Sequence, residues 1–547
     1  MKKIRIGDIL IQEGFITQHQ LQYALDVQKV VRQKIGSILT RLGLVSEYEL
    51  ATLLARQLGL RFVDLYRVEP DLTLLKRFNR NTCLHYKLFP IKLLKDKTLI
   101  ATSELPSREI EQICLRATGY LPKILIAEET KVITSIYNYF YFLENPIETI
   151  LRREAEVLAN DTTMTTSPDN FIQNLLLFAV KQRATDIHIR PMHDGISISM
   201  RIDGAMEHCF FFPKELKRII TAIKLQAGMD ISEQRLPQDG RWSVILLNKR
   251  YEIRASSIVT PYGENLVLRL LSQEQAHLSL EVLGFLPEDM PLIKQAFAEP
   301  FGILLLTGPT GSGKSTTLTA GLLSIDLLGK NVLTIEDPIE YVIPLARQTQ
   351  VNRAAGYDFA NAIRYFLRHD PDVILVGEMR DEITAKTAMT AANTGHFVLS
   401  TLHTNTALGA IPRLQGLGVD NLTIAESLVC IVSQRLVRTI CPQCKEEYAP
   451  DEEEKKYLKQ KDVTTLYRGK GCSFCNYTGY KGRTLVYEIL PVSKKLRSYI
   501  EQGENLYKLE QIILESGFKT MFDIAVKKVL LGLTDVKEVK RVLGTRY

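Results

Sequence analysis

The sequence is poor in tryptophan, in long apolar runs and in net charge. Its 547 residues include one tryptophan, and no apolar run approaches the roughly 20 residues of a membrane-spanning helix. Lysine and arginine number 69 against 62 acids, and a net charge of +7 over this length does not by itself indicate nucleic-acid or membrane binding. Asp8 and Glu13 interrupt what would be the apolar part of a signal peptide, so we expect a cytoplasmic protein.

Cysteines are also few, and four of the eight form two CxxC pairs. In a reducing compartment such pairs favour metal over disulfides. Cys441 and Cys444 are separated from Cys472 and Cys475 by 27 residues. Each pair can hold a metal from one turn, and four thiolates complete a tetrahedral structural zinc site. The alternatives are a redox pair or four buried thiols without metal, and the doubled motif favours zinc.

A repeat occupies the first sixty residues. Residues 5–28 align without gaps on residues 34–57, with eight of the 24 positions identical. In each copy a glycine ends one helix, and a capping box that begins at Thr17 or Ser46 opens the next. The repeat therefore predicts a helix pair that is used twice.

Changes of residue pattern predict a multidomain α/β fold. Alternating apolar and polar stretches after residue 170 indicate a sheet with one buried face. From about residue 285, helices alternate with apolar strands, the order of a parallel-sheet nucleotide-binding domain. The predicted parts are a helical tandem repeat at 1–60, a small α/β domain at 61–145, a linker at 146–170, an α/β sheet domain at 171–280, and a nucleotide-binding domain at 285–547 with a four-cysteine insert at 441–475.

One stretch fits the phosphate-loop pattern GxxxxGK[ST], after an apolar strand and before a helix, as the motif requires. The glycines let backbone N–H groups converge on phosphate oxygens, and the helix N-terminus adds a favourable dipole. We expect Lys314 to reach the β- and γ-phosphates of ATP and the Ser315 hydroxyl to ligate magnesium. The predicted nucleotide-binding residues are Gly308, Pro309, Thr310, Gly311, Ser312, Gly313, Lys314, Ser315 and Thr316.

Hydrolysis also needs carboxylates near the phosphate loop. Glu336 ends one apolar strand, and Glu378 is the acid directly at the end of another, because Gly377 stands where many phosphate-loop ATPases have an aspartate. We predict that both glutamates are catalytic. His396 and His403 flank a third apolar strand. A lone histidine is usually structural, but two that flank a strand in this chain order are interpreted as sensors of the γ-phosphate.

These segments together resemble the secretion ATPases of type II secretion and type IV pilus assembly. The resemblance covers about 171–547, and its motifs come in family order: ATDIHIRP, RIDG, RLPQDGR, YGENLVLRLL, the phosphate loop, TIEDPIEY, VGEMRD, TGHFVLSTLHTNTA and CPQC with GCSFCNYTGYKGR. It implies a PAS-like domain before a RecA-like motor domain. It also implies a homohexamer that hydrolyses ATP at subunit interfaces and drives an inner-membrane platform protein.

The resemblance also implies roles for single residues. Glu336 helps to activate water, and Glu378 supports magnesium and water. Arg254 and Arg269, which precede the motor domain, reach the γ-phosphate. Two positions depart from the family pattern, since Ile383 replaces an acid and a histidine stands before the DPD triplet at 369. Neither departure touches a residue assigned to chemistry.

Two other functions are alternatives to an assembly motor. A nucleic-acid translocase predicts a basic stripe with stacking aromatic residues, which this composition does not support, so no nucleic-acid partner is expected. Pilus-retraction ATPases generally lack both the N-terminal extension and the four-cysteine insert that this chain has. We therefore predict an assembly ATPase at the inner face of the cell membrane, with ATP, magnesium and structural zinc.

The tandem repeat has two interpretations. One is a helical module that docks onto the platform protein. The other rests on similarity to the tandem motifs of an N-terminal domain, present in some of these ATPases, that binds cyclic di-GMP. A basic residue at a helix start can meet phosphate or stack on guanine, although Lys34 lacks the planar fork of arginine. The implied half-sites are Arg5, Gly7, Gly14 and Gln28, and Lys34, Gly36, Gly43 and Gln57.

Overall fold

The computed structural model describes residues 5–161, 163, 165–272 and 279–545. They form two compact units, Met1–Leu50 with Gln275–Tyr547, and Ala51–Glu274. Residues 273–278, near the end of the predicted sheet domain (171–280), lie outside the described residues. So do the ends of the predicted repeat and motor domain (1–4 and 546–547) and residues 162 and 164 of the predicted linker. In the described ranges no helix combines the length and the apolar character that crossing a membrane requires.

The predicted helical repeat is confirmed. Its helices are α1 (Ile6–Gln12), α2 (Gln18–Val31), α3 (Ile35–Arg41) and α4 (Glu47–Leu58). The Thr17 hydroxyl accepts from the Gln20 N–H while the Gln20 side chain accepts from the Thr17 N–H, and Ser46 and Glu49 form the same reciprocal pair. These capping boxes satisfy N–H groups that a helix start leaves unpaired.

The small α/β domain follows as predicted. Its strands are β1 (Arg61–Phe62), β2 (Leu88–Leu93), β3 (Lys97–Thr102) and β4 (Leu121–Ile126), in the sheet order β1-β4-β3-β2. Its helices are α5 (Leu72–Leu75), α6 (Arg80–His85), α7 (Arg108–Thr118) and α8 (Glu129–Glu144). Ser107 caps α7 and Gly119 ends it at φ 82°, so the local sequence sets both helix ends.

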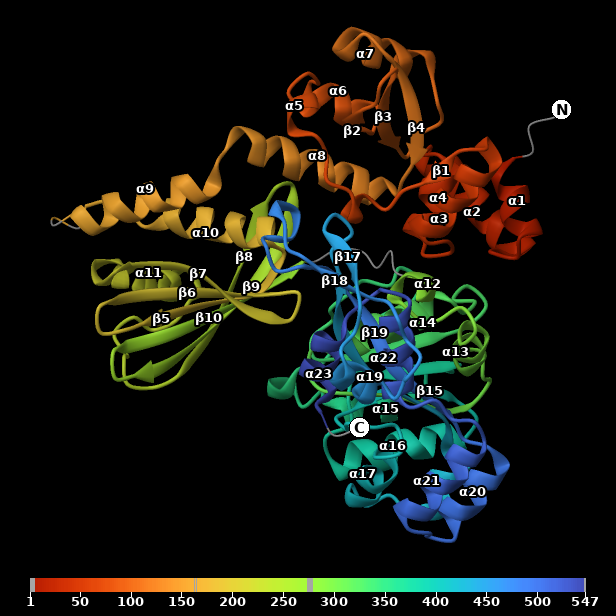
Figure 1. The fold of residues 1–547 in the computed structure, drawn as a ribbon. Coiled ribbons are helices and arrows are strands. Elements are labelled where there is room, and N and C mark those ends of the chain that lie inside the picture. The colour runs from red at the N-terminus through yellow and green to blue at the C-terminus, as the bar shows by residue number, and fades with distance from the viewer. Residues whose placement is uncertain (1–4, 162, 164, 273–278, 546–547) are drawn as a thin grey trace. The chain divides into compact units, whose positions relative to one another are not determined.

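The next domain is a six-stranded antiparallel sheet covered by helices (Figure 1). Its sheet order is β7-β6-β5-β10-β9-β8. The strands are β5 (Ala184–Pro191), β6 (Gly195–Ile202), β7 (Ala205–Pro213), β8 (Gln238–Leu246), β9 (Lys249–Thr260) and β10 (Gly263–Ser272), and the helices are α9 (Ile147–Asn160), α10 (Asp169–Gln182) and α11 (Arg218–Gln226).

Helix α9 lies in the segment predicted as a linker. Its residues Ile147, Leu151, Ala155 and Leu158 are buried and belong to the core of the sheet domain. They recur at spacings of three and four, the period of one helix face. The first part of 146–170 is therefore an element of the sheet domain, and only the polar end of the segment has the composition of a linker.

The motor domain contains a seven-stranded sheet in the order β13-β12-β14-β15-β11-β16-β19. The first six strands run parallel, and β19 pairs antiparallel with β16. The strands are β11 (Gly302–Thr307), β12 (Val332–Glu336), β13 (Arg347–Gln350), β14 (Val373–Val376), β15 (Phe397–Leu402), β16 (Leu428–Ile440) and β19 (Tyr480–Pro491). Parallel strands covered by helices are the arrangement the sequence predicts.

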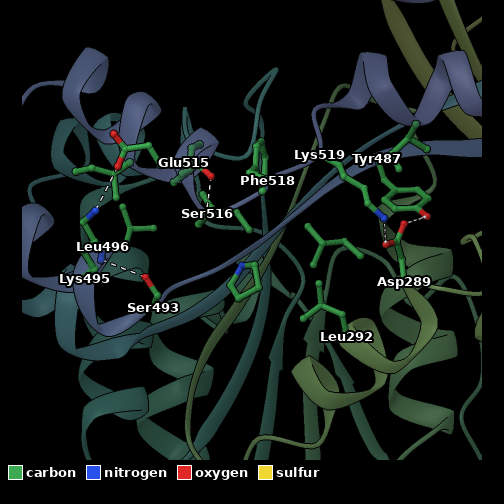
Figure 2. Close-up of a pocket in the computed structure, with 17 residues that line it drawn as sticks. Asp289, Leu292, Tyr487, Ser493, Lys495, Leu496, Glu515, Ser516, Phe518 and Lys519 are labelled. Atoms are coloured by element: carbon green, nitrogen blue, oxygen red, sulfur yellow. Dashed lines mark hydrogen bonds and ion pairs between the residues drawn. The ribbon is translucent and has the colours of Figure 1, made fainter.

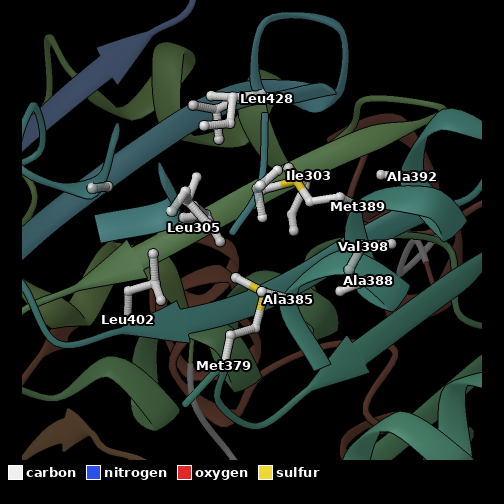
Figure 3. Close-up of a cluster of buried hydrophobic side chains, with 14 of the residues drawn as sticks. Ile303, Leu305, Met379, Ala385, Ala388, Met389, Ala392, Val398, Leu402 and Leu428 are labelled. Atoms are coloured by element: carbon white, nitrogen blue, oxygen red, sulfur yellow. The ribbon is translucent and has the colours of Figure 1, made fainter. Parts of the chain in front are cut away.

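Helices cover both faces of this sheet. Alternate residues of β11 point to opposite sides, so Ile303 and Leu305 join one core while Leu304 and Leu306 join the other. Figure 3 shows the first core, where Ile303, Leu305, Val398 and the small side chains of α16 lie together. The helices are α12 (Leu280–Leu283), α13 (Met290–Phe297), α14 (Lys314–Leu323), α15 (Phe359–Phe366), α16 (Glu382–Asn393), α17 (Ala410–Gly416) and α18 (Asn421–Ser427).

The C-terminal part adds the cysteine insert and four helices. The insert holds a two-stranded sheet of β17 (Lys445–Tyr448) and β18 (Leu466–Gly469) with α19 (Glu452–Leu458). The last helices are α20 (Lys494–Glu501), α21 (Leu506–Glu515), α22 (Met521–Leu530) and α23 (Val536–Leu543). The charged segment after Pro450 is thus largely helical, although Tyr457 and Leu458 are buried.

Candidate nucleotide site and metal centre

The predicted phosphate loop lies between β11 and α14. Gly308, Gly311 and Gly313 have φ values of 141°, 77° and 88°, which other residues rarely adopt. A Cβ on Gly308 would lie 2.4 Å from the Gln434 carbonyl oxygen. The glycines therefore allow a turn that side chains would prevent, and the turn leads directly into the N-terminus of α14, where an anion is stabilised.

Lys314 is the first residue of α14 and its ammonium group folds back over the loop. Its Nζ donates to the carbonyl oxygens of Gly308 and Pro309, at 2.9 and 3.1 Å. Burial lowers the pKa of Lys314, and the nearby carboxylates of Glu378 and Glu340 act in the opposite direction. A partly buried cation that donates to two carbonyl oxygens suits the binding of phosphate, which supplies a full opposing charge.

The loop is also held from the neighbouring strand β16. The Gln434 side-chain amide donates to the Ser312 carbonyl oxygen at 2.9 Å, and both residues are buried. Gln434 was not predicted from the sequence. A signal was present, because Gln434 is a polar residue within the apolar run of β16, and a buried amide there requires a specific partner.

The two glutamates predicted to be catalytic lie at the same sheet edge as the loop. Strands β11, β12, β14 and β15 are parallel, so their carboxyl ends meet at one edge, the usual ligand position in such sheets. Glu336 ends β12 and accepts hydrogen bonds from the Thr334 hydroxyl at 2.8 Å and the Gln348 amide at 2.9 Å. Burial raises the pKa of Glu336. Gln348, on edge strand β13, was not predicted, and its polar surroundings in the sequence gave no signal.

Glu378 and His403 come together beside Lys314. Glu378 pairs with Arg380 at 2.6 Å, and the Nε2 atom of His403 lies 3.7 Å from Glu378. Burial lowers the pKa of His403, and the positive charge of Lys314 lowers it further. His403 is therefore largely neutral at neutral pH and can donate one hydrogen bond while it accepts another.

His396 occupies the opposite end of β15. Its Nδ1 atom lies 2.9 Å from the Ala391 carbonyl oxygen and 3.2 Å from the Thr394 hydroxyl, which fixes it at the end of α16. Six residues of β15 separate it from His403, a length of about 20 Å in a strand. The structure does not bring His396 to the phosphate loop, and a structural role at the helix end accounts for it.

Arg254 and Arg269 lie on neighbouring strands of the other unit. They are directly opposite each other on β9 and β10, and Arg241 of β8 lies opposite Arg254 on its other side. Arg254 pairs with Glu252 at 3.1 Å and Arg269 with Asp186 at 2.9 Å. Like charges in adjacent cross-strand positions repel one another. Glu252 and Asp186 offset this repulsion within the row of three arginines, and Arg241 was not singled out from the sequence.

The four predicted metal ligands form one cluster. The sulfur atoms of Cys441, Cys444, Cys472 and Cys475 all lie within 4.8 Å of one another. Three pairs of these sulfur atoms are 3.7 to 3.8 Å apart. Zinc–thiolate bonds of about 2.3 Å in a tetrahedron place the sulfurs about 3.8 Å apart. Backbone N–H groups of Gly471, Cys472 and Gly479 point at these sulfurs, an arrangement that stabilises thiolates. The donor set and spacing fit zinc.

The motor domain has a second hollow away from the phosphate loop. A cavity of about 510 Å³ lies between α13, β19 and helices α20 to α22 (Figure 2). Its most buried charged group, Asp289, accepts from the Tyr487 hydroxyl and the Lys519 ammonium, both at 2.8 Å. These polar groups bond one another, so we assign the cavity no ligand.

Comparison with known proteins decides the family. A family model described as "Type II/IV secretion system protein" matches residues 163–541, and a second, for the MshEN domain, matches residues 58–144. The chain belongs to the type II/IV secretion system protein family. The predicted resemblance is thus confirmed over the motor domain and the domain before it. The MshEN match covers the small α/β domain and the last residues of the repeat.

Curated relatives agree with this family. The type IV pilus assembly ATPase PilB of Thermus thermophilus is 36% identical over an alignment that covers 98% of this chain and 66% of that protein. PilB of Myxococcus xanthus is 34% identical, with 98% of both chains covered. The type II secretion system protein E of Klebsiella pneumoniae is 42% identical over 68% of this chain and 75% of its own length. This chain is an ATPase of the type II/IV secretion system family.

Packing and backbone conformation explain why glycine stands at four positions of the tandem repeat. A Cβ on Gly7 would lie 2.7 Å from the Leu21 side chain, and one on Gly36 would lie 3.1 Å from Leu50, so both glycines let neighbouring helices pack closely. Gly14 and Gly43 end their helices at φ values of 76° and 71°. Arg5 and Lys34 are exposed at the starts of α1 and α3, and Gln28 donates to the Gln33 carbonyl oxygen. Gln57 lies near the end of α4.

Proposed function

We propose that this chain is the ATP-hydrolysing subunit of a homohexameric motor that drives type IV pilus assembly or type II secretion through an inner-membrane platform protein. The observation that carries the proposal is the gathering of Lys314, Glu336, Glu378 and His403 at one edge of the parallel sheet. Pilus assembly is favoured, because the two PilB relatives align over 98% of this chain and the type II protein over 68%. Such a motor works at the inner face of the cell membrane.

The phosphate loop binds and orients ATP. Its N–H groups surround the phosphates, and Lys314 leaves the carbonyls of Gly308 and Pro309 to pair with the β- and γ-phosphates. The ammonium then neutralises negative charge that grows as the γ-phosphoryl group is transferred. The exposed Ser315 hydroxyl, next along α14, would hold magnesium, which supplies further neutralisation of the phosphates when bound.

The two glutamates have different roles in hydrolysis. Glu336, held by Thr334 and Gln348, accepts a proton from the attacking water, since its raised pKa makes it a stronger base than an exposed glutamate. Glu378 supports magnesium and water from the end of β14. The neutral ring of His403 donates a hydrogen bond to the γ-phosphate. The position of the segment that follows β15 then depends on whether the γ-phosphate is bound.

The arginine row completes the site in a ring. Arg254 and Arg269 belong to the domain before the motor and have carboxylates of that domain as their partners. The motor domain's own loop offers one lysine close to the phosphates. We therefore assign the arginines to the γ-phosphate of a neighbouring subunit, which makes the nucleotide site a feature of the assembled hexamer.

Two further ligands are part of the proposal. Zinc held by the four cysteines is structural, because four thiolates leave no open position for chemistry. Cyclic di-GMP binds the tandem repeat, with Arg5 and Lys34 at the helix starts of the two half-sites and Gln28 and Gln57 at the far ends. The MshEN match beside the repeat supports this assignment.

The test compares two variants of the phosphate site. Lys314→Ala should lower kcat at least about 100-fold with the fold unchanged, the loss typical of removing a transition-state donor. Glu336→Gln should still bind ATP but turn over about 10²- to 10⁴-fold more slowly, the usual contribution of a general base. In the wild type, turnover should fall on acidification at a higher pH than an exposed glutamate would dictate, since protonation of Glu336 removes the base.

Steady-state ATPase assays across pH, with nucleotide binding measured separately, check these expectations. Glu382→Gln is a matched control, because Glu382 is exposed on α16 and pairs with Lys386 away from the loop. It should keep wild-type kcat. Wild-type turnover by Lys314→Ala would defeat the assignment of the site.

A further inference from the structure

Glu488 is a buried acid that the chemistry above does not use. It lies on β19 opposite Ser433 of β16, and 7% of it is exposed. Its Oε2 atom accepts from the Ala407 N–H at 2.7 Å, and its Oε1 atom accepts from the Met521 N–H at 3.2 Å. Both carboxylate oxygens are thus bound to backbone donors from segments far apart in the sequence.

The first of these segments carries His403. Ala407 lies four residues after His403, in the stretch that leaves the carboxyl end of β15. The same stretch is held from β16, where Arg435 donates to the Asn405 side-chain oxygen at 3.1 Å. His403 itself is 3.7 Å from Glu378. A shift of this stretch would therefore move His403 relative to the phosphate loop.

The second segment is the start of α22. Met521 is its first residue and Thr520 its cap, so Glu488 lies at the N-terminus of a ten-residue helix. The helix dipole and the two N–H groups stabilise the carboxylate against the burial that raises the pKa of Glu488. Glutamine cannot replace it fully, because its amide nitrogen is a donor and would face one of the two N–H groups.

We propose that Glu488 is a positioning residue for ATP hydrolysis, tying the 403–407 segment to the N-terminus of α22 so that His403 is held beside Glu378. The inference rests on the role of His403 in the proposed function. It gives the C-terminal helices a defined mechanical link to the nucleotide site, since the Glu488 side chain joins the start of α22 to the segment that follows His403.

The test uses steady-state kinetics of the full chain. Glu488→Gln should lower kcat about 10- to 100-fold, the loss expected when a catalytic group is misplaced by about an ångström. The KM for ATP should change little, because the backbone partners of Glu488, Ala407 and Met521, lie outside the phosphate loop. In a His403→Ala background the same substitution should lower kcat no further, since its effect passes through His403.

Asp289→Asn is the matched control. Asp289 is 8% exposed and accepts from Tyr487, the neighbour of Glu488 on β19, but it faces the cavity of Figure 2. Its substitution should leave kcat at the wild-type value. Equal losses in the two variants would mark a general weakening of the domain and overturn the proposal.

The other outcomes distinguish the positioning role of Glu488 from the proposed role of His403. Wild-type kcat in Glu488→Gln, or losses that add to those of His403→Ala, overturn the positioning role alone. Wild-type kcat in His403→Ala defeats the role of His403 and the proposal with it, and leaves the Lys314 and Glu336 assignments standing. If Glu488→Gln does not fold, Asn405→Ala replaces it. Asn405 is exposed, and its substitution should lower kcat severalfold at constant KM. An unchanged kcat contradicts the proposal.

Discussion

At the scale of single residues, the four cysteines make the sharpest prediction. Protein purified without chelator should contain one zinc per chain. Cys472→Ser should lose most of it and melt at a lower temperature, because structural zinc in small domains contributes about 10–16 kcal/mol of apparent binding free energy. Metal analysis and thermal unfolding measure both effects.

Cys209→Ser is the control for this prediction. Cys209 is half-buried on β7 and lies outside the cluster. Its substitution should leave the zinc content unchanged. Absence of metal from the wild type, or full zinc in Cys472→Ser, would contradict the assignment.

Residues with a strong sequence signature could be predicted, and their supporting partners could not. Lys314, Glu336 and Glu378 follow apolar strands at motif spacing, so parallel-strand geometry brings them to one edge. Gln348 and Arg241 carry no signature, because their positions depend on which strands become neighbours. That pairing is set by long-range packing that spacing along the chain does not reveal.

At the scale of elements, the repeat of α1 to α4 makes the next prediction. If Arg5 meets the phosphate or guanine of cyclic di-GMP, Arg5→Ala should weaken binding by about tenfold or more, since a lost charged hydrogen bond costs about 1.5–3 kcal/mol. Calorimetric titration of the full chain with cyclic di-GMP measures the change. ATP turnover in the absence of the dinucleotide should be unchanged.

Lys29→Ala serves as the comparison, because Lys29 is exposed on α2 and pairs with Asp26. It should bind as the wild type does. The wild type could instead show no binding at about millimolar ligand, which means a binding free energy weaker than about −4 kcal/mol. In that case the interpretation of the helical repeat as a docking module is the one that remains.

The residues at which helices begin and end were the most predictable part of the fold. The capping boxes at Thr17 and Ser46 and the glycines that end α1 and α3 are local chemistry, and the structure has them where the sequence indicates. Helix α9 was missed for an equally physical reason. Its apolar stripe is short and precedes a polar, proline-containing stretch, so only its packing against the sheet domain distinguishes it from a linker.

At the scale of the whole molecule, the account depends on residues from different units acting in one site. The phosphate loop belongs to the unit of residues 1–50 and 275–547, and the arginine row belongs to the unit of residues 51–274. The sequence predicts both sets of residues, and the family resemblance implies that they meet at an interface between two copies of the chain.

Subunit complementation tests this central claim most directly. Lys314→Ala has intact arginines, and Arg254→Ala has an intact phosphate loop, so each protein alone should hydrolyse ATP at a small fraction of the wild-type rate. In mixed rings, some sites combine the loop of one protein with the arginines of the other. The account predicts that the mixture turns over ATP clearly faster than the sum of the two proteins measured apart. A rate equal to that sum, from mixtures shown to form joint rings, would contradict a site shared between subunits.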